Sequence, residues 1–210
     1  MLFKFKYCYF GMEIFMNNEY IEGLRKQVKK ALKTDKKRYR HTLGVADTCA
    51  CLAMKYDVDM EKAYVAGLLH DCAKCVPDEV KLQECKTFGI EISEFEKNSP
   101  YLLHSKLGAY YASHLYNIYD EEICSAIKWH TTGTASMTKL EEIVYIADYI
   151  EPYRNNAENL SRIRKLAFTN LSEAVYEVSR DTLVYLRKKG GCIDPATVKT
   201  YEYYEKYYKD

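Results

Sequence analysis

Apolar residues recur at helical spacing along almost the whole chain, and few prolines or glycines interrupt the pattern. The first stripe begins just after Met16 and contains Ile21, Leu24, Val28 and Leu32. Steps of three and four residues place these side chains on one face of a helix. The pattern predicts a helical chain whose apolar faces meet in a common core.

Further helices are predicted where the same spacing is bounded by capping residues, proline or glycine. One helix begins near Asp35, and the next runs from about Met60 to Leu69. Three more begin at Pro77, at Ser99-Pro100 and near Asp120. They are followed by a helix from Thr138 to Ile150, one or two helices from Leu160 to Arg187, and a last helix that begins at Asp194. The tyrosines of the last helix share one side. We expect a single-domain, all-α bundle over residues 17–193, with the tyrosine-rich helix 194–210 packed on the same domain.

Residues 1–16 mix apolar side chains with lysines. They contain neither a continuous apolar run nor a small-residue cleavage site, which argues against a signal peptide. We interpret them as a disordered extension or as sequence upstream of the true start. Elsewhere no run is long enough to cross a membrane. Eight cysteines without an export signal indicate reduced thiols in a cytoplasmic protein.

The charges are balanced, with 31 basic and 30 acidic residues and a net charge of +1. This balance gives no bulk electrostatic reason for binding nucleic acid or a membrane surface. We therefore expect neither partner, while a homodimer stays open.

The strongest local indication of chemistry is the pair His70-Asp71, at the end of an apolar helix. Adjacent side chains on a helix point about 100° apart, so both can bind one metal only where the helix ends. Imidazole and carboxylate together suit first-row divalent ions. Taken alone, the pair is also compatible with a capping aspartate beside a half-buried histidine.

Other histidines and an aspartate lie on the apolar faces of separate predicted helices. His41, His104 and His130 share their faces with apolar residues, and Asp148 lies on the stripe of its own helix. An aspartate on an inward face is costly unless it is paired or bound to a metal. Because helical bundles build metal sites from side chains on facing helices, we expect one shared site.

The order of these residues resembles that of the HD-domain superfamily of metal phosphohydrolases: His41, then His70-Asp71, then Asp148, with His104 and His130 between, as in members that have a two-metal site. Three strings, HDCAK at 70–74, WHTTG at 129–133 and ADYIEPYR at 147–154, are similar to the bacterial YqeK branch. That branch consists of symmetrical diadenosine tetraphosphate hydrolases. The resemblance extends over roughly residues 18–189 and implies an HD-domain helical fold.

The resemblance also implies how the ligands divide between two metals. One ion would be held by His41, His70, Asp71 and Asp148, and Asp71 would bridge to a second ion completed by His104 and His130. Two ions about 3.5–4 Å apart can deprotonate a bridging water and polarise a phosphoryl oxygen. Mixed histidine and carboxylate sites choose weakly among iron, manganese, cobalt and zinc. The resemblance implies iron.

Five residues beside the predicted ligands are candidates for contacting phosphate: Lys74, Thr131, Thr132, Gly133 and Arg154. The resemblance favours a phosphate contact by Lys74, with a catalytic role beside Asp71, over a solvated lysine. Arg154 could clamp a phosphate bidentately, although a surface position fits it nearly as well. The threonines and glycine follow a helix end and either contact phosphate or form a turn. Glu151 ranks lower, as a residue that orients a ligand or pairs with Arg154.

The leading hypothesis for function is hydrolysis of diadenosine tetraphosphate to two ADP by a metal-bridged hydroxide. The alternatives are a cyclic-dinucleotide phosphodiesterase, a deoxynucleotide triphosphohydrolase, or a non-catalytic nucleotide- or metal-sensing module. The Gly-Tyr-Pro tripeptide that marks one phosphodiesterase group is absent. Single-metal triphosphohydrolases lack counterparts of His104 and His130. We therefore expect a dinucleotide polyphosphate as the substrate.

Overall fold

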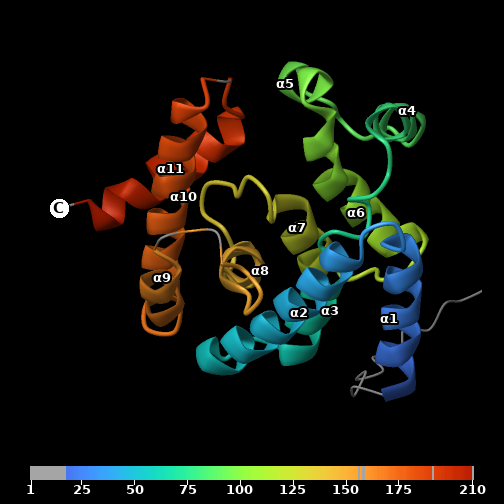
Figure 1. Ribbon diagram of the computed structural model, residues 1–210, viewed down its shortest axis with the longest axis horizontal. Coiled ribbons are helices and arrows are strands. Elements are labelled where there is room, and N and C mark those ends of the chain that lie inside the picture. The colour runs from blue at the N-terminus through green and yellow to red at the C-terminus, as the bar shows by residue number, and fades with distance from the viewer. Residues whose placement is uncertain (1–17, 156, 158, 191, 210) are drawn as a thin grey trace, which may run out of the picture.

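The computed structural model describes residues 18–155, 157, 159–190 and 192–209, and within these ranges the chain is helical without a strand. The interpretation of residues 1–16 falls outside the described residues. The elements, shown in Figure 1, are α1 (Asn18–Ala31), α2 (Lys36–Tyr56), α3 (Met60–Leu69), α4 (Asp78–Thr87), α5 (Glu94–Asn98), the 3₁₀ turn η1 (Pro100–Leu102), α6 (Leu103–His114), α7 (Glu121–Trp129), α8 (Lys139–Ile150), α9 (Leu160–Ala167), α10 (Leu171–Lys188) and α11 (Pro195–Tyr208). The all-α fold class is confirmed, while the exact domain limits stay a prediction.

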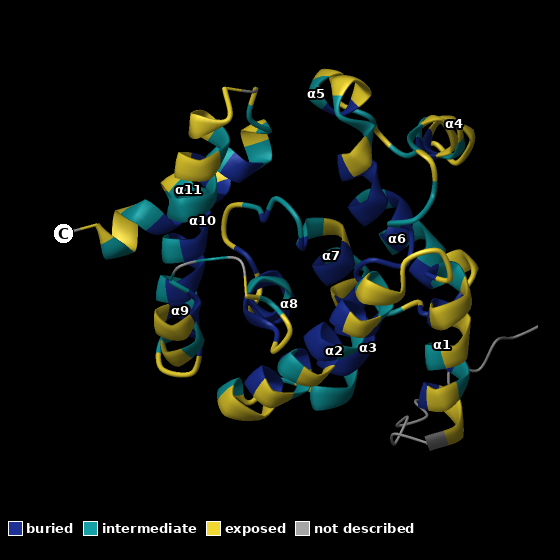
Figure 2. Cartoon of the chain, viewed as in Figure 1, coloured by how far each residue is buried: buried dark blue, intermediate teal, exposed yellow. Residues whose placement is uncertain are grey.

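Helix α8 lies at the centre and packs against α2, α7 and α10. It is buried along most of its length, from Leu140 to Ile150. A capping box begins it, because the Thr138 side chain accepts from the Glu141 amide while the Glu141 carboxylate accepts from the Thr138 amide. Figure 2 shows buried positions concentrated where α2, α3, α7 and α8 meet. The core therefore surrounds the helix that carries Asp148.

The contact between α2 and α3 is close because Gly67 carries no side chain. A Cβ at this position would lie 2.8 Å from the Cys49 sulfur and 2.9 Å from the Ala46 Cα. Helix α3 ends at Leu69, directly before His70 and Asp71, as its pattern predicted. The close approach of α3 to α2 therefore places the end of α3 beside His41.

Two local features differ from the predicted pattern. Helix α5 was not predicted, although Ser93 and Glu96 form a complete capping box at its start. The helix expected to open at Ser99-Pro100 starts as the 3₁₀ turn η1 and becomes α-helical only at Leu103. Ser99 stands at the cap position without a capping hydrogen bond from its side chain. The Ser99 amide donates to the Glu96 carbonyl of α5, and the Ser99 carbonyl accepts from the Leu102 amide, which closes the 3₁₀ turn.

The C-terminal helices form a layer beside α8. The segment from Leu160 to Arg187 contains two helices, α9 and α10, separated by a short turn. Helix α11 packs on α10, where Tyr201 and Tyr208 lie against the Tyr176 ring. The buried Tyr204 hydroxyl donates to Glu142 of α8 at 2.9 Å. These contacts fix α11 on the helical body.

The described part of the chain contains no helix with the length and apolar character needed to span a membrane. Its seven cysteines are free thiols, of which Cys49, Cys72 and Cys85 are buried and Cys51 is exposed.

The packing at Gly67 predicts that Gly67→Ala lowers the free energy of unfolding by about 1–3 kcal/mol, because the added methyl group overpacks the contact between α2 and α3. The matched control is Gly23→Ala in α1, where an added Cβ has no neighbour within 4 Å. Alanine there should raise the free energy of unfolding by about 0.5–1 kcal/mol through helix propensity alone. Urea unfolding of both variants measures the difference. Equal effects of the same sign would contradict the packing explanation.

Candidate metal centre

The six predicted ligands converge on one buried point, although they come from five different helices or helix ends. They are His41 in α2, His70 and Asp71 after α3, His104 in α6, His130 after α7 and Asp148 in α8. The four histidines and Asp71 are at most 8% exposed. Asp148 is partly buried, with 24% of its side chain exposed. The cluster therefore joins the helices of the central core at a single site.

Each histidine is held at its Nδ1 atom and turns its Nε2 atom toward the centre. For three of them the acceptor is the backbone carbonyl three residues earlier, at Gly67, Tyr101 and Ile127. These distances are 2.6 to 2.7 Å. His41 instead places Nδ1 3.1 Å from the Glu151 carboxylate. A carbonyl can only accept, so Nδ1 carries a proton, and in the neutral ring Nε2 then has a free lone pair. This is the form in which imidazole binds a metal.

Asp71 lies between two groups of these nitrogen atoms. Its Oδ1 atom is 3.3 Å from His104 Nε2 and 3.7 Å from His130 Nε2. Its Oδ2 atom is 3.3 Å from His70 Nε2 and 3.9 Å from His41 Nε2. Asp148 lies on the second side, with Oδ1 3.0 Å from His41 Nε2. The residues thus form two ligand groups that share one carboxylate.

The donor atoms fit a bound cation. His70 Nε2 and Asp71 Oδ1 are buried and have no hydrogen-bond partner among the described residues. The Nε2 atoms of His104 and His130 face each other at 3.2 Å. Lone pairs that face one another in a buried site are costly unless a cation lies between them. Three groups of these residues have ligand atoms within 4.8 Å of one another, a spacing that a metal ion could fill.

The pKa shifts of Asp71 and His104 favour the charge states that metal binding needs. Burial lowers the pKa of His70, but Asp71 and Asp148 outweigh it and raise this pKa above its usual value. Burial alone would raise the pKa of Asp71, but His70, His104 and His130 hold this pKa well below its usual range. Burial lowers the pKa of His104 to about 4, so its ring is neutral at physiological pH. An ionised carboxylate beside a neutral imidazole is the donor pair preferred by first-row divalent ions.

Lys74 and Thr131 lie beside the group that contains His104 and His130. Lys74 Nζ is 3.1 Å from His104 Nε2 and 3.8 Å from Asp71 Oδ1. Burial lowers the pKa of the Lys74 amine. The Thr131 hydroxyl is 3.0 Å from His130 Nε2 and 3.2 Å from His104 Nε2. The structure therefore brings a lysine and a hydroxyl to the same side of Asp71.

Thr132 and Gly133 form the turn that carries Thr131. The Thr132 carbonyl accepts from the Thr200 hydroxyl of α11 at 3.0 Å. Gly133 has a φ of +67°, and a Cβ there would lie 2.6 Å from Thr200. Glycine is the residue that tolerates both conditions. Their observed contacts are structural, and phosphate binding by these two residues stays a prediction.

Arg154 lies on the opposite side, beside Asp148. Its guanidinium donates to Asp148 Oδ1 at 2.8 Å and to the Asp148 carbonyl at 3.0 Å. The loop that carries it is held by Arg164, which donates to the carbonyls of Ile150, Glu151 and Arg154. Arg154 therefore has a defined position at the cluster.

Two further residues hold the ligands: Arg38, which the sequence did not indicate, and Glu151, for which orienting a ligand was one of two predicted roles. Arg38 donates to Asp71 Oδ2 at 2.8 Å. Arg38 precedes His41 by one helical turn. The position of both residues on one helix face was therefore the feature of the sequence that could have identified Arg38. Glu151 is 2% exposed and holds His41. Gly44 makes room for it, since a Cβ there would lie 2.6 Å from Glu151 Oε2.

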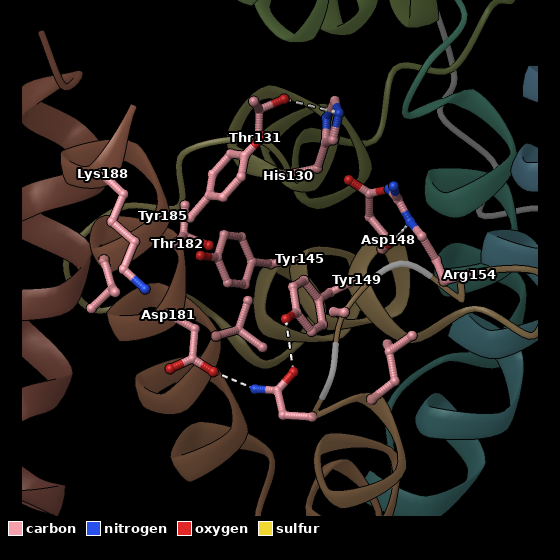
Figure 3. Close-up of a pocket in the computed structure, with 15 residues that line it drawn as sticks. His130, Thr131, Tyr145, Asp148, Tyr149, Arg154, Asp181, Thr182, Tyr185 and Lys188 are labelled. Carbon is pink, nitrogen blue, oxygen red and sulfur yellow. Dashed lines mark hydrogen bonds and ion pairs between the residues drawn. The ribbon is translucent and has the colours of Figure 1, made fainter. Parts of the chain in front are cut away.

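A cavity of about 670 Å³ opens from the cluster and extends to α10. Figure 3 shows His130, Thr131, Asp148 and Arg154 at one side, and Tyr185 and Lys188 at the other. Volumes of about 300–1,000 Å³ are usual for small-molecule sites. The candidate metal centre is therefore open to a ligand of nucleotide size.

A helical fold with histidines and aspartates gathered around one buried aspartate defines the class of the protein. The chain belongs to the HD-domain family, whose model matches residues 38–153. The resemblance to this superfamily is thereby confirmed.

Its relatives narrow the class further. It is 38% identical over 166 residues to the symmetrical bis(5'-nucleosyl)-tetraphosphatase of Bacillus subtilis, covering 79% of this chain and 88% of the relative. It is 36% identical over 191 residues to the Staphylococcus aureus protein of the same name, covering 90% of this chain and 95% of that relative. A crystal structure from Clostridium acetobutylicum, described as a predicted HD superfamily hydrolase involved in NAD metabolism, matches with a TM-score of 0.85 and 37% identity over 89% of this chain and 97% of that one.

The contact between Glu151 and His41 predicts that Glu151→Ala weakens metal binding by about 10–100-fold, because partners of this kind orient a ligand histidine. Glu151→Gln keeps an oxygen acceptor for His41 Nδ1 and should lose less. Calorimetric titration of metal-free protein with manganese compares the two variants. Wild-type affinity in Glu151→Ala would show that His41 needs no such support.

Proposed function

We propose that this chain hydrolyses diadenosine tetraphosphate symmetrically, giving two ADP. Its relatives from Bacillus subtilis and Staphylococcus aureus are named for this activity. The observation that carries the proposal is the position of Asp71, with one oxygen facing His104 and His130 and the other facing His70 and His41. Such an arrangement suits a phosphohydrolase that uses two metal ions.

We propose that both ligand groups hold a transition metal and that Asp71 bridges the two ions. Iron is the first choice, and manganese, cobalt and zinc fit the same donors. When bound, two such ions supply an activated water and polarise a phosphoryl oxygen. The cytoplasmic location is part of this proposal, and a homodimer stays open.

The side chains around the centre have separate tasks in the proposed reaction. Lys74 and Thr131, on the side of His104 and His130, bind phosphate oxygens. Arg154, beside Asp148, offers a guanidinium that can form two parallel hydrogen bonds to a phosphate. Since Lys74 is half-buried, its charge acts in a site partly shielded from water. Together Lys74 and Arg154 neutralise the charge of the central phosphates on the two sides of the bond that breaks.

The bond broken is the one between the middle bridging oxygen and the attacked phosphorus. Water adds its oxygen to that phosphorus, and the bridging oxygen leaves with the other ADP. The products are two ADP and a released proton. No substrate hydroxyl or terminal phosphate is needed as a nucleophile.

Incubation of metal-loaded protein with diadenosine tetraphosphate should therefore yield ADP alone, with one ADP per turnover labelled in heavy-oxygen water. Lys74→Ala and Arg154→Ala should keep the metal but slow turnover by about 10–1000-fold, because each offsets charge that develops in the transition state. The matched control is Lys97→Ala, which removes an exposed lysine that pairs with Glu94 in α5, and it should match the wild type.

Chromatography that shows AMP and ATP would contradict symmetrical cleavage. Absence of cleavage with metal present would favour a different nucleotide phosphohydrolase or a sensor.

A further inference from the structure

Two unlike hollows lie on either side of the metal centre, and Arg154 lines both. The first is the cavity of Figure 3, here called the nucleoside cavity, which extends from His130 and Asp148 to Asp181 and Tyr185. The second, here called the basic groove, lies beside His41 and is lined by Lys37, Arg38 and Arg40. A symmetrical dinucleotide bound across the centre would therefore meet different surroundings at its two ends.

The nucleoside cavity has groups that can recognise a base. At the end away from the ligands, the Asn159 side-chain amide nitrogen donates to the Asp181 carboxylate, and its Oδ1 atom accepts from the Tyr149 hydroxyl at 3.0 Å. The Asp181 carboxylate lines the cavity, where Figure 3 places it below Lys188 and Tyr185. Arg180 pairs with its Oδ1 atom at 3.1 Å, which leaves lone pairs of the carboxylate for a further donor. Tyr185 is 55% exposed and offers a ring face on which a base can stack.

The basic groove is lined mainly by charged side chains, and Tyr153 and Asn155 are the groups on its wall that could contact a base. Arg38 reaches Asp71, and Arg40 lies over the Tyr153 ring with its guanidinium carbon 3.8 Å from the ring centre. The two acids on its wall are already engaged. Asp35 caps α2 by accepting from Arg38, and Glu151 holds His41. The remaining cations attract phosphate whatever nucleoside follows it.

We propose that the two halves of the dinucleotide are bound unequally, an inference that rests on the proposed function. The half whose phosphorus is attacked places its nucleoside in the nucleoside cavity, where Asp181 and Tyr185 determine specificity. The leaving half lies along the basic groove and is held through its phosphates. The oxygen of water therefore joins the half that occupies the nucleoside cavity.

Adenine fits the nucleoside cavity better than uracil does. Its larger ring system stacks more strongly on tyrosine, and its exocyclic amino group can donate to the Asp181 carboxylate. The only ring N–H of uracil that can face Asp181 lies between two carbonyl oxygens, which a carboxylate repels. Good contacts to a base discriminate by about 1–3 kcal/mol, which corresponds to a ratio of about 5 to about 150.

The test uses a mixed substrate in which adenosine and uridine are joined through four phosphates. Cleavage in heavy-oxygen water gives ADP and UDP, and mass spectrometry measures which product carries the label. We expect ADP to carry at least about five times more label than UDP. Asp181→Asn and Tyr185→Ala should each bring this ratio several-fold closer to one.

Two control variants separate base recognition from other effects. Glu177 lies one turn before Asp181, and both carboxylates pair with Arg180. The Glu177 side chain does not line the nucleoside cavity, so Glu177→Gln removes a neighbouring charge without changing the cavity wall. It should leave the label ratio at its wild-type value. Arg40→Ala should raise KM without moving the ratio, because the basic groove holds phosphates only.

Equal labelling of ADP and UDP by the wild type would overturn the inference while symmetrical cleavage stood. The inference would also be overturned if Arg40→Ala changed the label ratio while Asp181→Asn and Tyr185→Ala both left it unchanged. Because Tyr185 is largely exposed, its variant keeps the test decisive if Asp181→Asn proves unstable. Failure to cleave diadenosine tetraphosphate itself would instead count against the proposed function.

Discussion

The structure depends on a buried aspartate that faces lone pairs of four histidines. Asp71 is 1% exposed, and its two oxygens lie between nitrogen atoms delivered by α2, α6 and the ends of α3 and α7. Such a concentration of acceptors in the core is unfavourable without positive charge. Arg38 and Lys74 supply part of that charge at the edges. Metal ions between the acceptors would supply the rest and would join the helices that provide them.

Several features of the fold keep these acceptors in place. Gly67 allows α3 to approach α2, and the Gly67 carbonyl in turn holds His70. The same backbone contact, to a carbonyl three residues earlier, orients His104 and His130. Each of these ligands is thus fixed by its own helix end or turn. The position of the centre follows from how the helices pack, and the orientation of each ring follows from local backbone geometry.

The two sides of the centre differ in ways that matter for the substrate. On one side lie α9 and α10, with aromatic rings and a chain of side-chain hydrogen bonds through Asn159. On the other side lies the start of α2, with arginines and a lysine. A substrate that is symmetrical in its chemistry would therefore bind to an unsymmetrical protein surface. Arg154, which lines both hollows, lies where the two halves of such a substrate meet.

The sequence predicted the elements and residues that follow from local spacing. Inward-facing histidines and the end of a helix at His70 can be recognised from the pattern of apolar positions. The contact of Glu151 with His41 joins residues 110 positions apart, and the carboxylate lies just past the end of α8, where helical periodicity no longer applies. Apart from its spacing to His41, nothing in the local sequence distinguishes Arg38 from the neighbouring lysines, whose side chains are exposed. The role of Thr132 and Gly133 depends on Thr200 of α11, a contact across 68 positions that spacing does not reveal.

The most direct test of this account is the number of metal ions bound per chain. Metal-free protein loaded with manganese and then freed of excess metal should retain about two ions per chain, as expected for a dinuclear site. The electron paramagnetic resonance spectrum should be that of two magnetically coupled ions. Asp71→Ala should lose the coupled spectrum and most of the metal, whereas Glu122→Ala, which removes an exposed acid on α7, should keep both. Two coupled ions retained in Asp71→Ala would contradict the central role given to Asp71.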